Sequence, residues 1–243
     1  MSDWSRFERL TPFRVRDVLL VASHFDHYLL EESGYLAEIM RQEYSELNLS
    51  QSPRIIHSPE ARDALRLLQA RDFDVVITMA RVGEMDVNAF GIEAKKISPG
   101  LPVMMLSHNT RELAGLSVGE GIDRIFVWTG DSRILLSICK LIEDERNVEN
   151  DVRDGDVQVI LLVEDSRRFY SAYLPLLYTQ MANQTTRLMG EGGNLHEKLL
   201  RLRARAKILL ASDMDSAKTI INRYQKNLIG VFTDGRFPNE GGK

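Results

Sequence analysis

Short apolar runs alternate with longer segments in which apolar residues recur every three or four positions, and this pattern extends over the first 144 residues. Continuous apolar runs of this kind are typical of strands that are buried on both faces of a parallel sheet. The runs predict strands over residues 15–22, 54–57, 73–79, 102–106 and 122–128. The periodic segments predict helices over residues 26–47, 59–68, 87–97, 111–116 and 132–143. Strands that alternate with helices in this way predict an α/β fold, a three-layer sandwich with right-handed crossovers.

A second, shorter unit of the same type follows. Apolar runs predict strands over residues 157–163, 207–211 and 228–232, and a helix that begins at Ser166 contains Pro175, which should kink it. Residues 183–205 read as an insertion that is largely helical. The helix over 132–143 is expected to have a polar extension, followed by a linker that has too few apolar residues to form a core. The expected organisation is a domain over 1–146, a linker over 147–156 and an incomplete unit over 157–243.

Acidic residues follow two strands of the second unit. Glu164 and Asp165 come directly after the strand over 157–163, and Asp234 follows the strand over 228–232. Because the carboxyl ends of parallel strands meet at one edge of a sheet, these carboxylates can converge there. Oxygen ligands without His or Cys favour Mg²⁺ over zinc, and an aspartate beside Mg²⁺ can accept a phosphoryl group. The alternative is that all three are unrelated turn and capping residues, which are common roles for Asp.

These residues and the following Gly235-Arg236-Phe237-Pro238 resemble the first half of a response-regulator receiver domain of the CheY-like family. The resemblance implies a flavodoxin-like, doubly wound parallel five-stranded sheet for the first unit and part of one for the second. It also implies that Glu164, Asp165 and Asp234 bind Mg²⁺ and that Asp234 is the phospho-acceptor. The implied partner is a histidine kinase or phosphotransfer protein.

The sequence reaches Lys243 before the fourth and fifth strands that a receiver has. In the receiver strand order 2-1-3-4-5, the strand over 228–232 is then an edge, and it carries no Lys or Pro that would discourage pairing. This arrangement predicts either a homo-oligomer formed through that edge or a second unit that is less ordered than the first.

The first unit resembles a receiver in layout but lacks its chemistry. Ala22-Ser23 stands where the acidic pair should follow the first strand, and Met79 occupies the phospho-acceptor position. Trp128-Thr129 replaces the Lys-Pro pair of the family. We therefore expect a degenerate pseudo-receiver that is not phosphorylated. Asp26 and Asp86 could rebuild a cation site, but this alternative is less favoured because neither has an adjacent acidic residue.

Three functions remain open. The leading hypothesis is a phosphorelay signal transduction protein, which is not an enzyme. The alternative is a non-catalytic regulatory or docking region of a phosphoenolpyruvate-synthase-like protein, which the segments around Leu174-Pro175-Leu176 and residues 202–207 resemble. The third is an aspartate-nucleophile phosphohydrolase, but Asp165-Ser166-Arg167 lacks the second Asp that such enzymes carry two residues after the nucleophile.

Composition and charge limit the classes of partner and the cellular location that we expect. The formal net charge is −4, and no apolar run approaches the roughly 20 residues of a membrane span, so we expect neither nucleic acid nor membrane as a partner. A single cysteine, Cys139, and an N-terminus without a secretory pattern indicate a cytoplasmic protein. The basic residues of segment 198–207 are expected on a solvated helix face. His24 and His27 lack a third metal ligand in the sequence.

Overall fold

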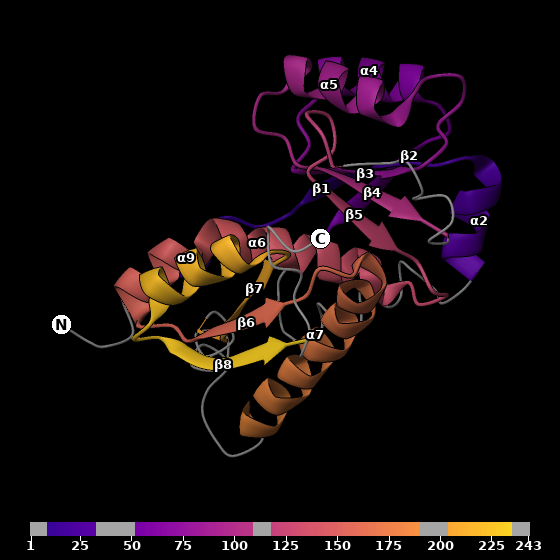
Figure 1. Ribbon diagram of the computed structural model, residues 1–243. Coiled ribbons are helices and arrows are strands. Elements are labelled where there is room, and N and C mark those ends of the chain that lie inside the picture. Colours follow the sequence, from indigo (N-terminus) through magenta and orange to yellow (C-terminus); the bar gives the residue numbers. More distant parts are fainter. Residues whose placement is uncertain (1–8, 33–51, 109–117, 190–203, 235–243) are drawn as a thin grey trace, which may run out of the picture. The chain divides into compact units, whose positions relative to one another are not determined.

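The computed structural model describes residues 9–32, 52–108, 118–189 and 204–234, and these residues form two compact units (Figure 1). Among the described residues, the N-terminal unit comprises residues 15–139. The C-terminal unit comprises residues 140–234 together with residues 9–14. The boundary therefore lies before residue 146, and the first described residues of the chain belong to the C-terminal unit.

The N-terminal unit is a parallel sheet with the strand order β2-β1-β3-β4-β5. Its elements are β1 (Asp17–Val21), α2 (His24–Glu32), β2 (Arg54–Ser58), α4 (Ala61–Ala70), β3 (Val75–Met79), α5 (Val87–Ile97), β4 (Val103–Ser107), β5 (Arg124–Val127) and the beginning of α6 (Arg133–Gly155). This order confirms the predicted flavodoxin-like, doubly wound five-stranded sheet. The predicted helix over 111–116 and most of the one over 26–47 lie outside the described residues.

Both faces of this sheet are covered because successive side chains of a strand point to opposite sides. Leu19 and Val21 pack in one core with Ala64 of α4 and Phe90 of α5. Figure 1 shows α4 and α5 together on one side of the sheet. The other face is lined by Val18, Leu20 and Ile77 with Leu135 and Cys139 of α6. Because helices cover both faces of the sheet, the strands are continuous apolar runs in the sequence and do not alternate between apolar and polar residues.

The C-terminal unit contains a smaller parallel sheet with the strand order β7-β6-β8. Its elements after α6 are β6 (Val159–Val163), α7 (Arg167–Met189), β7 (Lys207–Ala211), α9 (Met214–Tyr224) and β8 (Leu228–Thr233). The second, incomplete unit is thereby confirmed, and β8 is an edge strand among the described residues. The sequence pattern did not single out α9. Helix α7 continues through Pro175 and includes the first part of the predicted insertion over 183–205.

The core of the C-terminal unit lies between its sheet and two helices. Leu161 and Leu209 from the strands pack with Val148 of α6 and with Ala217 and Tyr224 of α9. On strand β8 the pairing with β6 is irregular, since Val159 pairs with Leu228 while Ile160 pairs with Gly230. Ile229 is therefore an extra residue, which makes a bulge in this edge strand.

The predicted linker over residues 147–156 is wrong, because α6 continues without interruption to Gly155. Asn147, Val148 and Asp151 are buried in this part of the helix. Their polarity made the segment look solvated, but each polar side chain has partners in the folded unit. The helix ends at Gly155, where an added Cβ would lie 2.7 Å from Leu10 Cδ2.

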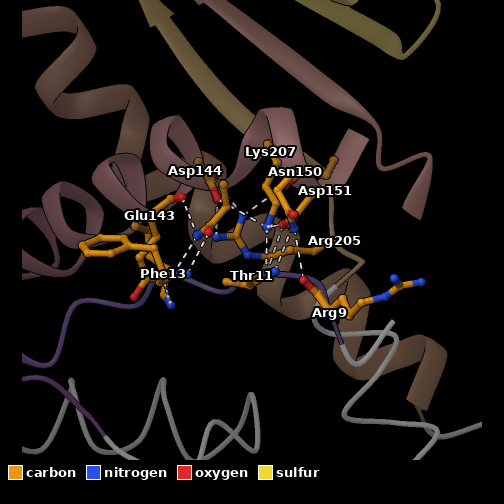
Figure 2. A network of polar contacts seen from close by, with 12 residues as sticks. Arg9, Thr11, Phe13, Glu143, Asp144, Asn150, Asp151, Arg205 and Lys207 are labelled. Carbon is orange, nitrogen blue, oxygen red and sulfur yellow. Dashed lines mark hydrogen bonds and ion pairs between the residues drawn. The ribbon is translucent and has the colours of Figure 1, made fainter. Parts of the chain in front are cut away.

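A buried polar network joins three segments of the C-terminal unit (Figure 2). Asn147 accepts a hydrogen bond from the Phe13 amide at 2.9 Å and donates one to the Phe13 carbonyl at 2.7 Å. Asp151 accepts from the Thr11 amide at 2.8 Å and pairs with Lys207 Nζ at 2.8 Å. These contacts fix residues 11–13 to α6 and β7, and they explain why the start of the chain belongs to this unit.

Asp144 is the centre of the same network. Its carboxylate receives two hydrogen bonds from the Arg205 guanidinium, at 2.7 and 3.0 Å, and one from the Tyr178 hydroxyl at 3.1 Å. The Ile208 amide donates a further bond at 3.0 Å. Lys207 is buried, Arg205 is only 12% exposed and both pair with Asp144, so the expectation that they lie on a solvated helix face is wrong.

No helix within the described ranges is both long enough and apolar enough to cross a membrane.

Candidate functional site

The three predicted carboxylates lie at the carboxyl ends of neighbouring strands. Val163 of β6 is in register with Thr233 of β8, so Glu164 and Asp234 occupy the next positions along each strand. The Asp234 amide donates a hydrogen bond to the Val163 carbonyl at 3.4 Å. The structure therefore brings Asp234 to the same edge of the sheet as Glu164 and Asp165, although about 70 residues separate them in the sequence.

Glu164 is the buried member of the group, with only 3% of the residue exposed, whereas Asp165 and Asp234 are exposed. Burial raises the pKa of Glu164, and the negative charges of Asp234 and Asp165 raise it further. A hydrogen bond from the Ser166 amide to Glu164 Oε1, at 3.0 Å, lowers the same pKa and opposes these effects. Burial is the largest cause of the raised pKa of Glu164, and the charges of Asp234 and Asp165 add a smaller repulsion that a bound cation would relieve.

The chemistry of this donor set fits a hard divalent cation, because every side-chain ligand is a carboxylate oxygen. The side chains are not already assembled around one point. Within the part of the chain that the structure describes, no group of three His, Cys, Asp or Glu side chains is arranged to hold a metal ion. The Mg²⁺ site remains a prediction.

An open pocket of about 590 Å³ adjoins these carboxylates. Its apolar lining includes Phe169, Tyr173 and Leu176 of α7 together with Phe232 of β8, and Glu164 and Asp234 contribute its acidic part. Phe169, Tyr173 and Leu176 follow one another at intervals of four and three residues, so they share one face of α7. All three side chains and Phe232 are exposed. An apolar surface beside an acidic crevice is typical of an interaction site.

Mg²⁺ is expected to stabilise the protein against unfolding, because a ligand that binds only the folded state shifts the equilibrium toward it. At a concentration about 100-fold above the dissociation constant, the expected gain is about 2.7 kcal/mol. Asp165→Asn should abolish the gain, and Asp215→Asn should retain it, because Asp215 lies on the exposed first turn of α9. Thermal unfolding with and without Mg²⁺ measures this effect. Equal shifts in wild type and Asp165→Asn would disprove the site.

The corresponding edge of the N-terminal unit has different chemistry. Met79 ends β3 and is buried, and Ala22 follows β1 and is fully buried. The two carboxylates that were candidates for a rebuilt cation site have structural partners. Asp86 is the N-cap of α5 and accepts from the amides of Asn88 and Ala89. Asp26 accepts hydrogen bonds from Ser23 Oγ at 2.7 Å and lies 2.7 Å from His108 Nε2.

Histidines gather at this edge, and the sequence pattern did not reveal it. His24 and His27 belong to the first turn of α2, and His57 of β2 lies against both of them. The His27 and His57 rings are stacked with centroids 3.9 Å apart. The sequence contains no signal for this contact, because the position of His57 relative to α2 depends on the pairing of β2 with β1.

Several solved structures of receiver domains are similar to this chain. One is the signal receiver domain of an HD-domain-containing protein from Pseudomonas fluorescens Pf-5, with 22% identity over 57% of this chain and 94% of that chain and a TM-score of 0.39. Another is NtrX from Brucella abortus, with 15% identity over 92% of this chain and 62% of that chain and a TM-score of 0.44.

A third is a response regulator from Burkholderia pseudomallei that contains a phosphorylated aspartic acid and a calcium ion. It has 12% identity over 79% of this chain and 94% of that chain, with a TM-score of 0.38. No protein-family model and no curated protein matches the sequence. With all of these TM-scores below 0.5, the strand order β2-β1-β3-β4-β5 is what establishes the flavodoxin-like fold of the N-terminal unit.

Proposed function

We propose that the protein is a phosphorelay signal transduction protein in which Asp234 accepts a phosphoryl group and the N-terminal unit is a pseudo-receiver without that activity. The proposal is supported by the three carboxylates that follow β6 and β8, where burial raises the pKa of Glu164 and the charges of Asp234 and Asp165 raise it further. The expected partner is a histidine kinase or a phosphotransfer protein.

In this proposal the three carboxylates have different tasks. Asp234 is exposed, so one of its oxygens can attack the phosphorus atom of a donor. The bond between phosphorus and the imidazole nitrogen of a phosphohistidine then breaks, and the nitrogen leaves with the electron pair and is protonated. Glu164 and Asp165 are the residues that would hold Mg²⁺ beside Asp234. When bound, the ion would neutralise the phosphoryl oxygens.

Phosphorylation would replace the single negative charge of the Asp234 carboxylate with a phosphoryl group that carries about −1.5 to −2 charges at the end of β8. This charge would lie at the acidic end of the pocket lined by Phe169, Tyr173 and Phe232. Because the carboxylates already repel one another, the added charge would favour movement of their side chains and of a partner that occupies the pocket. We therefore expect phosphorylation to change the binding of a partner at this pocket.

The phosphorylation experiment treats the full chain with acetyl phosphate and Mg²⁺ and measures the intact mass. Wild type is expected to gain one phosphoryl group, located by peptide mass spectrometry at Asp234. Asp234→Asn should lose the label completely. Asp213→Asn is the matched control, because Asp213 is also in the C-terminal unit but its carboxylate caps α9, and this variant should keep the label. An acyl phosphate located in residues 1–144 would contradict the pseudo-receiver assignment.

The second candidate is a docking or regulatory region of a phosphoenolpyruvate-synthase-like protein, which uses its surfaces without phosphorylation. The exposed apolar side chains of α7 and β8 favour this candidate. The phosphorylation experiment separates the two candidates, because a docking region would remain unlabelled in wild type. A separate binding measurement with a partner would then show weaker association for Phe169→Ala than for wild type.

A further inference from the structure

The N-terminal unit carries three histidines at the edge where a functional receiver carries its carboxylates. His57 of β2 is paired in register with Leu20 of β1, and the end of β1 leads directly into α2, which contains His24 and His27. The His24 and His57 rings meet edge to face with centroids 5.6 Å apart, and the His27 and His57 rings are stacked at an interplanar angle of 19°. The three imidazoles therefore form one contact between α2 and β2.

The tautomer of the neutral His57 ring is fixed by its hydrogen bond. His57 Nε2 lies 2.7 Å from the Ala22 carbonyl oxygen, and because a carbonyl only accepts, Nε2 must carry the hydrogen. In the neutral ring Nδ1 is then the free acceptor. The His57 ring directly faces the stacked ring of His27.

The groups around His27 disfavour its charged form. Burial lowers the pKa of His27, and His57 and His24 lower it further. Glu31, whose Oε1 lies 3.6 Å from His27 Nε2, raises it and acts in the opposite direction. The other carboxylate at the start of α2, Asp26, is bonded to Ser23 and His108. Among the described groups that face the cluster, Glu31 favours the charged form of His27, whereas two imidazoles and burial disfavour it.

We propose that His24, His27 and His57 form a proton-responsive contact that holds the start of α2 against β2 near neutral pH and releases it in mild acid. Two imidazolium rings cannot remain stacked at 3.9 Å without strong repulsion. His57 is bonded to the end of β1, whereas His27 moves with α2, so separation of the rings displaces the first turn of α2. The pseudo-receiver would then respond to protons instead of phosphorylation.

The direction of the pH effect follows from linkage. His27 has a lower pKa in the folded protein than in an unfolded chain, so the folded contact binds protons less readily. Its contribution to stability is fully present above the unfolded pKa of about 6.5 and is lost as pH falls through the lower folded pKa. This proposal goes beyond the proposed function of Asp234, and its test contains neither Mg²⁺ nor a phosphoryl donor.

The experiment follows the full chain by NMR from about pH 8 to about pH 5, with histidine Cε1–H shifts and amide hydrogen exchange as the two measurements. His27 is expected to titrate below the range of an unfolded peptide. As it titrates, the amides of α2 should exchange at least about tenfold faster, which corresponds to a lower free energy of local opening. The amides of β3 should stay protected, which distinguishes local release from unfolding of the whole unit.

Matched glutamine variants complete the test. In His57→Gln the side-chain amide can still donate to the Ala22 carbonyl but cannot be protonated, so α2 should remain protected in acid and His27 should titrate at higher pH than in wild type. His108→Gln, which changes the histidine bonded to Asp26, should keep the acid response. An acid response in His57→Gln equal to that of wild type would overturn the proposal. Unchanged α2 protection through the titration of His27 would do the same.

Discussion

Replacing Asp144 with alanine is expected to lower the free energy of unfolding of the C-terminal unit by about 3–5 kcal/mol. Asp144 is fully buried and is the carboxylate that neutralises the guanidinium of Arg205, whose side chain is only 12% exposed. Burial opposes the charge of Arg205, but Asp144 raises the pKa of Arg205 well above its ordinary value. Without Asp144, the guanidinium keeps its charge and loses both short hydrogen bonds.

Two further groups that bond to Asp144 make the expected loss of stability larger than the loss of one ion pair would. The Tyr178 hydroxyl and the Ile208 amide both donate to Asp144 and would be left without this acceptor. Burial raises the pKa of Tyr178, and the charge of Asp144 raises it further, so the tyrosine remains a neutral donor. Lys207, whose pKa is lowered by burial and by Arg205, would lose one of its two compensating carboxylates.

Urea unfolding followed by far-UV circular dichroism measures the effect. Glu93→Ala is the control, because Glu93 pairs with Lys96 at 2.7 Å on an exposed helix surface, and such pairs contribute about 0–1 kcal/mol. If Asp144→Ala destabilised the protein no more than Glu93→Ala, the network around Asp144 would have no special role in holding the C-terminal unit together.

Gly91→Ala is expected to destabilise the N-terminal unit by about 3 kcal/mol, near the upper end of the usual cost of overpacking. An added Cβ at Gly91 of α5 would lie 2.2 Å from the Gly121 carbonyl oxygen and 2.6 Å from its carbon. Because these are backbone atoms, they cannot move aside as a flexible side chain can. A Cβ at Gly121 would in turn lie 2.2 Å from the Asn88 carbonyl oxygen, so the two backbones are in close contact.

The sign of the stability change in Gly91→Ala distinguishes close backbone packing from helix propensity. Glycine inside a helix is less favourable than alanine by about 0.5–1 kcal/mol, so helix propensity by itself predicts that Gly91→Ala stabilises the protein. Gly119→Ala is the control in the neighbouring segment, since its Cβ would have only an ordinary contact, at 3.6 Å, with Asn88 Oδ1. Stabilisation by Gly91→Ala in thermal unfolding would show that α5 does not require this close approach.

The sequence determined the strands and their order in the chain, because a strand that is buried on both faces must be apolar along its whole length. Residues 207–211 match β7, and residues 87–97 match α5, whose start and buried face have a physical cause. Asp86 caps the start of α5, and the apolar Phe90 and Ala94 fall on its buried face. The acidic edge of the second unit was also predictable, because neighbouring parallel strands place their carboxyl ends together.

The tertiary structure decided which charged residues are buried and which are exposed. Residues 147–156 have the composition of a linker, yet they are helical as far as Gly155, because Asp151 meets Lys207 and Asn147 meets the backbone of Phe13. These partners are more than fifty residues away in the sequence. The composition of a segment indicates how much free energy its burial costs. Whether the segment is buried depends on whether residues distant in the sequence supply hydrogen bonds and opposite charges that offset this cost.

The histidine cluster shows the same division between sequence and tertiary structure. His24 and His27 are three residues apart on one helix, and this spacing is visible in the sequence. The third ring, His57, reaches them only because β2 pairs in parallel with β1 and places the two strand ends side by side. Local periodicity determines which residues form each element, but strand pairing determines which elements become neighbours, and the interactions between ionisable side chains arise at those contacts.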